Sequence, residues 1–456
     1  MSHPPQGGNP LFRALVSLLT VALLMPAATL AQPSAGSIFP YSTHLETLDN
    51  GLEVLLIPMS SGGLVAYWSI VRTGSRDEVE PGRTGFAHFF EHMMFRGTEK
   101  YPSDDYDDLV TGIGADTNAF TSDDLTAYYL NIASDDLETV MDIESDRFQN
   151  LAYPEEMFET EAGAVYGEYR KNRMNPFFSL SEELRRTAFV EHTYGHTTMG
   201  YEEDIKLMPQ LFDYSKGFFE RFYRPENVVL VIVGDIEPAP TMEMIRRYYG
   251  DWEPGYQAPD VRPEPPQTEA RRVDVEYPGP ALPILWLGYK SPAFDPADLE
   301  QAAARLLCDL SFGETSAIYK KLVLEEQVAE FVSANLTPNR DPGLLDVLAR
   351  VKDPEKIDYV LGELDKAIAE AQATPPDAGR LADLKSRLKY RFLMNLDTPA
   401  NVMGNLVRII AVTGGIEAID TLYQTLDQVT PEDVQKAAQN LFVNERRTVA
   451  VLRGES

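Results

Sequence analysis

The residues most able to do chemistry lie in one short segment, 85–95, which reads GFAHFFEHMMF. After Gly85 it contains neither Gly nor Pro, and its apolar residues predict a helix. His88 and His92 are four positions apart, so their imidazoles share one helix face. Two neutral imidazoles at this spacing can hold Zn²⁺. Glu91 lies at the edge of the same face, where it can accept a proton from a metal-bound water.

A helix that contains two histidines by chance is the simpler alternative. The chain has only six histidines, so their chance placement beside a glutamate is improbable. The flanking residues are apolar, and burying three polar groups among them is costly unless they are paired or bind metal. The order His-x-x-Glu-His is the reverse of the more familiar zinc helix and is itself a metallopeptidase signature. We therefore predict a metal site.

Two imidazoles need a third protein ligand, with one position left for water. A predicted helix over 158–171 offers several acids, among them Glu159, Glu161 and Glu168. Glu161 and Glu168 are seven positions apart, two turns along one face, with small residues between them. One of them could bind the metal while the other orients a ligand. Spacing alone does not choose between these acids.

His192 and His196 form a second pair at the same spacing. Gly195 and the threonines around this pair predict a loop rather than a helix, and no acid nearby stands at ligand spacing. We expect a structural or substrate-facing role there. The single cysteine, Cys308, follows two leucines and is predicted to be a buried apolar residue. One cysteine excludes an internal disulfide framework and a cysteine-rich metal site.

The elements that position these residues are duplicated. Residues 222–234 and 442–454 each run from Phe to Gly over 12 positions, and each contains a β-branched strand. An amphipathic helix precedes each of these two segments. The helices are predicted at 211–222 and 431–442. An offset of 220 residues indicates duplicated domains rather than a solenoid.

A proline-rich linker at 253–269 fits this division, because five prolines suit an extended surface connection. We predict one domain over 40–252 and a second over 270–456. Residues 52–57 and 65–71 read as neighbouring strands, and long helical stretches follow. The predicted fold class is α+β, with an antiparallel-rich sheet and helices on one face in each of two duplicated α/β-roll domains.

Composition narrows the function classes. Acidic residues outnumber basic ones by 71 to 40, for a formal net charge of −31. This balance argues against nucleic acid as a partner and against docking on anionic lipid. The hydrophobic content of 44% is ordinary for a globular protein.

The N-terminus reads as a leader. Arg13 precedes an apolar run over 14–24 and a small-residue stretch that ends at Ala31. This pattern predicts a signal peptide over 1–31, cleaved after Ala31. The run is shorter than the about 20 residues of a spanning helix, although an uncleaved anchor stays an alternative. We expect an exported protein without a membrane span in its mature form, periplasmic if the source is a Gram-negative bacterium.

With these motifs the chain resembles the M16 family of inverzincin metallopeptidases. Glu168 follows His92 by 76 positions, and the match continues through 94–98 and 114–121. It also includes the strand at 228–234 and the repeat in the second domain. The resemblance covers essentially all of 40–456 and implies two similar α/β-roll domains.

The resemblance also implies the roles of the site residues. One Zn²⁺ per chain would be held by His88, His92 and Glu168, with Glu91 as the general base on the zinc-bound water. Glu161 would not bind the zinc itself but would orient one of the ligands. The implied activity is zinc-dependent endopeptidase hydrolysis of peptides or unfolded polypeptides. A non-catalytic zinc-binding assembly subunit of the same fold is the alternative from another class.

In the family, a segment equivalent to Asn118 and Ala119 lies at a sheet edge beside the zinc. The resemblance implies that an extended substrate adds there as a strand, with main-chain bonds giving the affinity. A turn residue is the simpler interpretation of Asn118.

The chain departs from the family at two positions. Self-sufficient members carry an Arg and, seven residues later, a Tyr, where this chain has Val323 and Glu330. Valine has no polar group and an ionised glutamate only accepts hydrogen bonds, so neither can hold a substrate carbonyl. The expected partner is a second M16-type chain that supplies this pair and lacks the zinc motif. A homodimer is the alternative.

Overall fold

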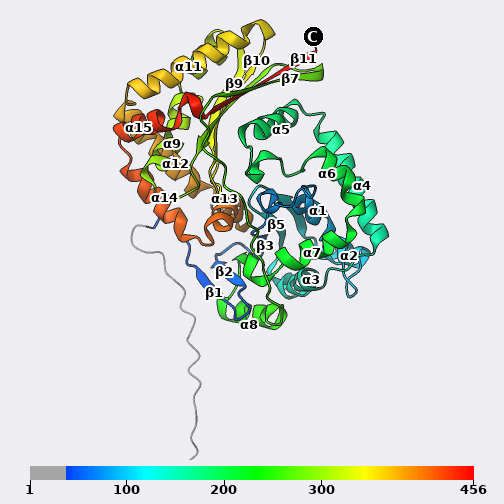
Figure 1. Ribbon diagram of the computed structural model, residues 1–456. Coiled ribbons are helices and arrows are strands. Elements are labelled where there is room, and N and C mark those ends of the chain that lie inside the picture. Colours follow the sequence, from blue (N-terminus) through cyan, green and yellow to red (C-terminus); the bar gives the residue numbers. More distant parts are fainter. Residues whose placement is uncertain (1–36, 456) are drawn as a thin grey trace, which may run out of the picture.

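Strands from the two parts of the chain form two separate sheets in the computed structural model, which describes residues 37–455 (Figure 1). The predicted signal peptide, residues 1–31, lies outside the described residues. The first sheet has the order β1-β2-β6-β3-β5-β4. Its strands are β1 (His44–Thr47), β2 (Glu53–Pro58), β3 (Leu64–Val71), β4 (Asp116–Thr121), β5 (Thr126–Ala133) and β6 (Val228–Gly234).

The predicted neighbours β2 and β3 do not pair with each other. Strand β6 lies between them, parallel to β2 and antiparallel to β3. All seven residues of β6 are buried. A continuous run of β-branched apolar residues is stable only where both faces are covered, so the last strand of this part takes the centre of the sheet. The prediction of adjacency was therefore wrong.

The second sheet repeats this arrangement. Its order is β7-β11-β8-β10-β9, and its last strand, β11, again lies parallel to one neighbour and antiparallel to the other. The strands are β7 (Arg271–Pro280), β8 (Ile284–Ser291), β9 (Ala329–Leu336), β10 (Gly343–Val351) and β11 (Arg447–Glu455). The predicted α+β class, with two related sheets that carry helices, is confirmed.

The N-terminal half (40–252) contributes α-helices that, apart from α5, pack on one face of the first sheet. They are α1 (Phe86–Met93), α2 (Ser103–Gly112), α3 (Leu137–Asn150), α4 (Glu155–Asn172), α5 (Pro176–Ala188), α6 (Glu202–Leu207), α7 (Phe212–Phe222) and α8 (Pro238–Tyr249). Aromatic residues dominate this core. Phe90 of α1 stacks on Phe218 of α7 with ring centroids 5.1 Å apart, and both are buried. This core fixes the position of α1.

The C-terminal half (270–456) contributes α-helices that, apart from α13, pack on the second sheet in the same way. They are α9 (Leu299–Phe312), α10 (Ala317–Tyr319), α11 (Ile357–Ala373), α12 (Ala378–Met394), α13 (Pro399–Thr413), α14 (Glu417–Gln428) and α15 (Pro431–Leu441). Cys308 of α9 is buried, and burial raises the pKa of its thiol to about 12. The prediction that Cys308 is a buried residue is confirmed.

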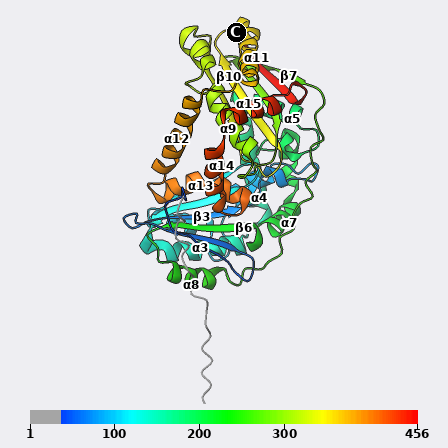
Figure 2. The same ribbon diagram turned by 90° about the vertical axis from the view of Figure 1, so that its left-hand side faces the viewer.

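Each sheet is also covered on its other face, which the sequence did not predict. Helix α13 lies across the first sheet (Figure 2), where Leu406 packs among Trp68 and Val231. Helix α5 lies on the second sheet, where Leu184 packs among Ile284 and Leu452. The two halves therefore exchange one helix each, and two hydrophobic clusters contain residues of both halves.

The linker at 253–269 contains no helix or strand. Glu264 anchors it by accepting hydrogen bonds from the backbone N–H groups of Val190, Glu191 and His192 at 3.0–3.1 Å. We propose that this linker separates two domains, 40–252 and 270–456. Within the described residues, no single helix is long and apolar enough to cross a membrane, and one bent pair, α13 with α14, meets that test of length and composition only jointly.

The exchanged helices predict that the two halves unfold together. Leu184→Ala and Leu406→Ala each open a cavity under the opposite sheet and should cost about 2–5 kcal/mol. Scanning calorimetry should show one transition that both variants move to lower temperature. Leu324→Ala, at a side chain that is 58% exposed, should change stability by less than about 0.5 kcal/mol. Two separate transitions, each moved by one variant, would contradict this expectation.

Candidate metal centre

Helices α1 and α4 bring together His88, His92 and Glu168, and their candidate ligand atoms all lie within 4.8 Å of one another. Glu168 Oε2 is 3.3 Å from His92 Nε2 and 3.7 Å from His88 Nε2. Tetrahedral zinc with bonds of 2.0–2.1 Å would separate its ligand atoms by about 3.3–3.4 Å. Two imidazole nitrogens and one carboxylate oxygen therefore suit zinc in their chemistry, and the separations of 3.3 and 3.7 Å are close to this spacing.

Glu161 lies directly behind His92. Its Oε1 accepts a hydrogen bond of 2.8 Å from His92 Nδ1, and its Oε2 accepts one of 2.7 Å from Arg96 Nε. Burial alone would raise the pKa of Glu161, but the contacts with His92 and Arg96 hold it below its ordinary value. An ionised carboxylate only accepts, so Nδ1 of His92 carries a proton, and Nε2 is the ring nitrogen that faces Glu168.

His88 is buried and faces the same space. Burial, together with the neighbouring His92, lowers the pKa of His88 to about 3, so its imidazole is neutral near pH 7. Neutral imidazole is the form that binds a metal ion. Within the described residues, His88 Nδ1 has no hydrogen-bond partner, so no competing contact turns this ring away.

Glu91 is held by a residue that the motif spacing could not indicate. Its Oε2 accepts a hydrogen bond of 2.6 Å from the hydroxyl of Thr121, the last residue of β4. Burial raises the pKa of Glu91 above its ordinary value, and the bond from Thr121 offsets part of this rise. A carboxylate with a raised pKa is suited to take up and release a proton near neutral pH. Thr121 lies in the segment 114–121 that resembles the family, but only the folded structure shows its contact with Glu91.

A second unpredicted contact fixes the start of α1. The helix begins after Gly85, whose φ of 92° is favourable only for glycine, and no side chain of Gly85 can cap it. Glu78 caps it instead, because its carboxylate accepts from the N–H groups of Gly85 at 2.8 Å and Ala87 at 2.7 Å. The carboxylate also complements the positive end of the helix dipole.

Asn118 and Ala119 lie on β4, which is an edge strand of the first sheet. Asn118 is exposed, and its Oδ1 accepts a hydrogen bond of 2.8 Å from the backbone N–H of Ala119. Ala119 itself is buried. The edge N–H of Ala119 is thus occupied by its own neighbour, and a strand that added there would have to displace the Asn118 side chain.

The remaining predicted sites lie elsewhere. Val323 is in a π-helical turn, Lys320–Glu325, and Glu330 forms an ion pair of 3.2 Å with Arg350. His192 and His196 flank a short 3₁₀ turn rather than sharing a helix face. His192 Nε2 lies 3.0 Å from Asp341 Oδ2, so this histidine makes a contact between the two halves. Among the described residues, His88, His92 and Glu168 are the one group with the geometry of a metal site.

Comparison with known proteins identifies the class. The chain matches the family model described as Insulinase (Peptidase family M16) over residues 54–202. It matches the model described as Peptidase M16 inactive domain over residues 213–388. The chain therefore belongs to peptidase family M16, a family of zinc proteases, as the resemblance predicted.

Individual relatives agree with this assignment over nearly the whole chain. The Zinc protease PqqE of Helicobacter pylori is 26% identical over 449 residues, which is 97% of this chain and 98% of that protein. The Mitochondrial-processing peptidase subunit beta of Dictyostelium discoideum is 26% identical over 420 residues, 90% of this chain and 88% of that protein. The crystal structure of a protease from Helicobacter pylori superposes with a TM-score of 0.86 at 25% identity, covering 91% of this chain and 100% of that chain.

We expect the purified chain to contain one zinc ion. His88→Ala and Glu168→Gln each remove a candidate ligand and should lower the metal content measured by mass spectrometry. Glu161→Gln should weaken the metal affinity by about 10- to 100-fold, because it loosens the orientation of a ligand. Glu159→Gln, an exposed position on the same helix, is the control and should leave the metal content unchanged. Full metal content in His88→Ala would contradict the assignment.

Proposed function

We propose that this chain is a zinc-dependent endopeptidase that hydrolyses internal bonds of peptides or unfolded polypeptides. The observation that carries the proposal is the convergence of His88, His92 and Glu168 beside the Glu91 carboxylate. A bound zinc ion would polarise the scissile carbonyl and lower the pKa of the attacking water. Glu91 would take a proton from that water and pass it to the leaving amine.

The neighbours of these groups would set the proton positions. Glu161 holds the proton of His92 on Nδ1, so Nε2 is free to bind. Thr121 directs the Glu91 carboxylate and keeps its pKa from rising further. Buried side chains of α1 hold these groups with little rotational freedom. Such preorganisation is what a proton transfer to a fixed base requires.

The substrate would bind along the outer edge of β4, where it would displace the Asn118 side chain from the N–H of Ala119. Its outer backbone groups, near Asn118 and Ala119, could pair with an extended peptide, as in β-strand addition. Folded proteins have no free strand to offer, so peptides and unfolded chains are the expected substrates. Because main-chain bonds supply most of the affinity, the sequence preference would be limited.

We further propose that the active form contains two chains. Val323 and Glu330 cannot supply the Arg and Tyr of self-sufficient family members, and Glu330 is already paired with Arg350. A second M16-type chain without the zinc motif would supply them, and one relative of this chain is itself named as a subunit. A homodimer is the competing arrangement. The predicted leader at 1–31 supports export, with the periplasm as the site of action in a Gram-negative source.

Glu91→Gln should abolish cleavage and keep the zinc. Loss of a general base costs about 10²–10⁴-fold in kcat, whereas the ligands are untouched. The measurement is cleavage of a quenched fluorescent peptide, with a chelator control and a parallel metal analysis. Glu99→Gln, an exposed position beyond α1, is the matched control. Cleavage by Glu91→Gln at the parent rate would refute the role of Glu91. A parent chain that binds zinc but never cleaves would instead indicate the non-catalytic assembly subunit.

Thr121→Val should move the acidic limb of the pH–rate profile to higher pH. The hydroxyl stabilises the ionised carboxylate of Glu91, so its loss raises the pKa of Glu91, and the base is lost to protonation at a higher pH. A shift of roughly 0.5–1 pH unit is expected in kcat/KM. Thr117→Val, on the same strand but bonded to the carbonyl of Tyr129, should keep the parent midpoint. An unchanged midpoint in Thr121→Val would remove Thr121 from this role.

A mixing assay tests the partner. The pure chain should be weakly active alone and should gain activity when the chain that co-purifies from its native source is added back. The partner should carry no His-x-x-Glu-His motif. Full peptidase activity from the pure chain at physiological concentration would overturn the need for a partner and favour the homodimer.

A further inference from the structure

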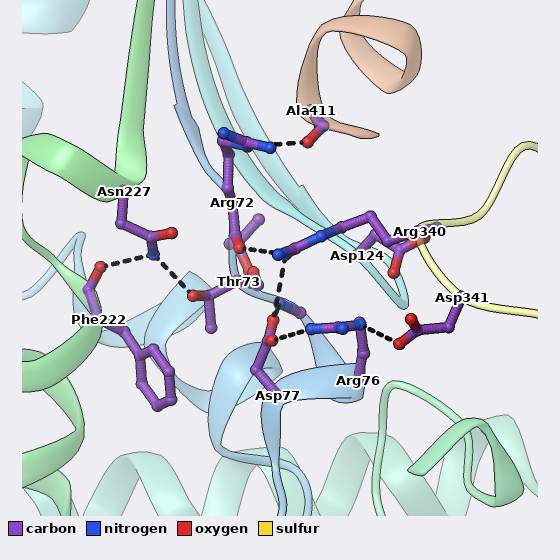
Figure 3. Close-up of polar contacts among 12 residues, drawn as sticks. Arg72, Thr73, Arg76, Asp77, Asp124, Phe222, Asn227, Arg340, Asp341 and Ala411 are labelled. Atoms are coloured by element: carbon purple, nitrogen blue, oxygen red, sulfur yellow. Dashed lines mark hydrogen bonds and ion pairs between the residues drawn. The ribbon is translucent and has the colours of Figure 1, made fainter. Parts of the chain in front are cut away.

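We propose that the loop between β9 and β10 in the C-terminal half is a positioning element for Glu91 in the N-terminal half, acting through Arg340 and Asp341. The inference rests on the proposed function, because it concerns the placement of the proposed base. Neither residue reaches the metal centre through a contact of its own. The contacts that follow form a polar cluster between the halves, and Figure 3 shows the part of it around Arg76, Asp77 and Arg340.

Arg340 enters the N-terminal half at the end of β3. Its backbone N–H donates to Asp124 Oδ2 at 3.1 Å, and its Nη1 donates to the carbonyl of Arg72 at 2.9 Å. The same Nη1 lies 4.0 Å from Asp77 Oδ2 (Figure 3). One residue of the C-terminal half therefore joins a strand end, a turn and a hairpin of the other half.

Asp341 makes the next set of contacts. Its Oδ2 accepts from Arg76 Nε at 2.6 Å and lies 3.0 Å from His192 Nε2. Its backbone N–H donates to the hydroxyl of Tyr194 at 3.3 Å, and that hydroxyl donates to Asp124 at 2.7 Å. The hydrogen bonds from His192 and Arg76 hold the pKa of Asp341 below its ordinary value, although burial alone would raise it. Asp341 is thus an ionised acceptor.

Burial makes these contacts obligatory. Asp77 and Asp124 are both completely buried, and a buried carboxylate is tolerated only when it is paired or hydrogen-bonded. Arg76 Nη1 donates to Asp77 at 2.9 Å, while Arg340 supplies the second cation near it. Loss of the Arg340 side chain would leave Asp77 with one cation and the Arg72 carbonyl without a donor.

The cluster is connected to Glu91 by two short paths, and the first runs through the β4–β5 hairpin. Arg76 lies in the 3₁₀ turn η1 (Ser75–Asp77), and its N–H donates to the carbonyl of Asp123 at 2.8 Å. Gly74 packs so closely on this hairpin that a Cβ there would lie 2.2 Å from the carbonyl of Ser122. Ser122 directly follows Thr121, the donor to Glu91.

The second path runs through the start of α1. Glu78 follows Asp77 in the chain, and its carboxylate caps α1 at Gly85 and Ala87. A shift of η1 would therefore move the cap of the helix that carries Glu91. Both the helix and the hydroxyl that orient the base depend on one turn, and the loop of the C-terminal half fixes that turn.

The consequence is a specific effect on the rate. A base that is misplaced by a fraction of an ångström accepts the proton more slowly, which lowers kcat. The affinity for substrate and the metal ligands change little. The expected signature of a disturbed loop is a lower kcat with KM and zinc content retained. A merely structural contact between the halves would lower stability without this split.

The test compares Arg340→Ala, Arg340→Lys and Asp341→Asn with the parent in its active form, alone or with its co-purifying partner. Arg340→Ala should lower kcat by about 10- to 100-fold. Arg340→Lys keeps a cation near Asp77 and should recover part of the loss. The matched control is Arg271→Ala, which removes another arginine of the C-terminal half that donates to carbonyls of the N-terminal half, at Thr187 and Ala188. This control should keep kcat and KM within about twofold of the parent.

A double variant tests the path through Thr121. If the loop acts by holding that hydroxyl on Glu91, the kcat loss of Arg340→Lys with Thr121→Val should be smaller than the product of the single losses. Arg340→Lys and Asp341→Asn also cover the case in which Arg340→Ala does not fold. Folded loop variants with the parent kcat would overturn the inference. An equal loss in Arg271→Ala, loss of zinc in step with kcat, or independent effects in the double variant would also overturn it.

The outcome is separable from that of the proposed function. If the parent cleaves in a zinc-dependent way and Glu91→Gln does not, the proposed function stands whatever the loop variants show. If Glu91→Gln cleaves at the parent rate, the proposed function fails, and the inference about its base fails with it.

Discussion

Helix α1 has only eight residues, and the chemistry of the chain depends on its placement. An isolated helix of this length is not stable in water, so its position comes from tertiary packing. Phe86, Phe89, Phe90 and Met93 are fully buried among aromatic residues of α4 and α7. The opposite side of the helix carries the two histidines and Glu91. The apolar face thus fixes the rotation of the helix, and this rotation aims the polar groups at α4.

The polar side of α1 is stabilised by a chain of charged contacts rather than by apolar contact. Arg96 holds Glu161, Glu161 holds His92, and His92 faces Glu168. At the other end of the helix, Glu78 caps its first N–H groups. Two carboxylates at opposite ends therefore limit how α1 can slide or turn, which explains how a short helix can present a defined set of ligand atoms.

The exchange of α5 and α13 extends the same constraint to the whole chain. Each sheet needs cover on both faces, and each receives part of this cover from the opposite half. The C-terminal half carries no metal-site group among its described residues, yet it completes the core beneath the first sheet. The polar cluster at Arg340 and Asp341 lies at the same junction (Figure 3). The C-terminal half therefore helps to shape the N-terminal half, which contains the candidate metal site.

The sequence by itself determined the fold class, the family and the histidine pair with its glutamate, because these can be recognised from local spacing and repeated motifs. His88, Glu91 and His92 lie within one predicted helix, and the duplicated strand endings are visible as repeated patterns. Spacing did not decide which of Glu161 and Glu168 faces the metal position. The packing of α4 places Glu161 at Nδ1 of His92 and Glu168 at its Nε2.

Only the tertiary structure decided the contacts made between residues far apart in the chain. The insertion of β6 between β2 and β3, the exchanged helices, the bond from Thr121 to Glu91 and the cap from Glu78 are of this kind. A pattern of side chains along one segment carries no record of which distant segment lies against it. That information arises when burial of both sheet faces and the pairing of buried charges select one arrangement of the whole chain.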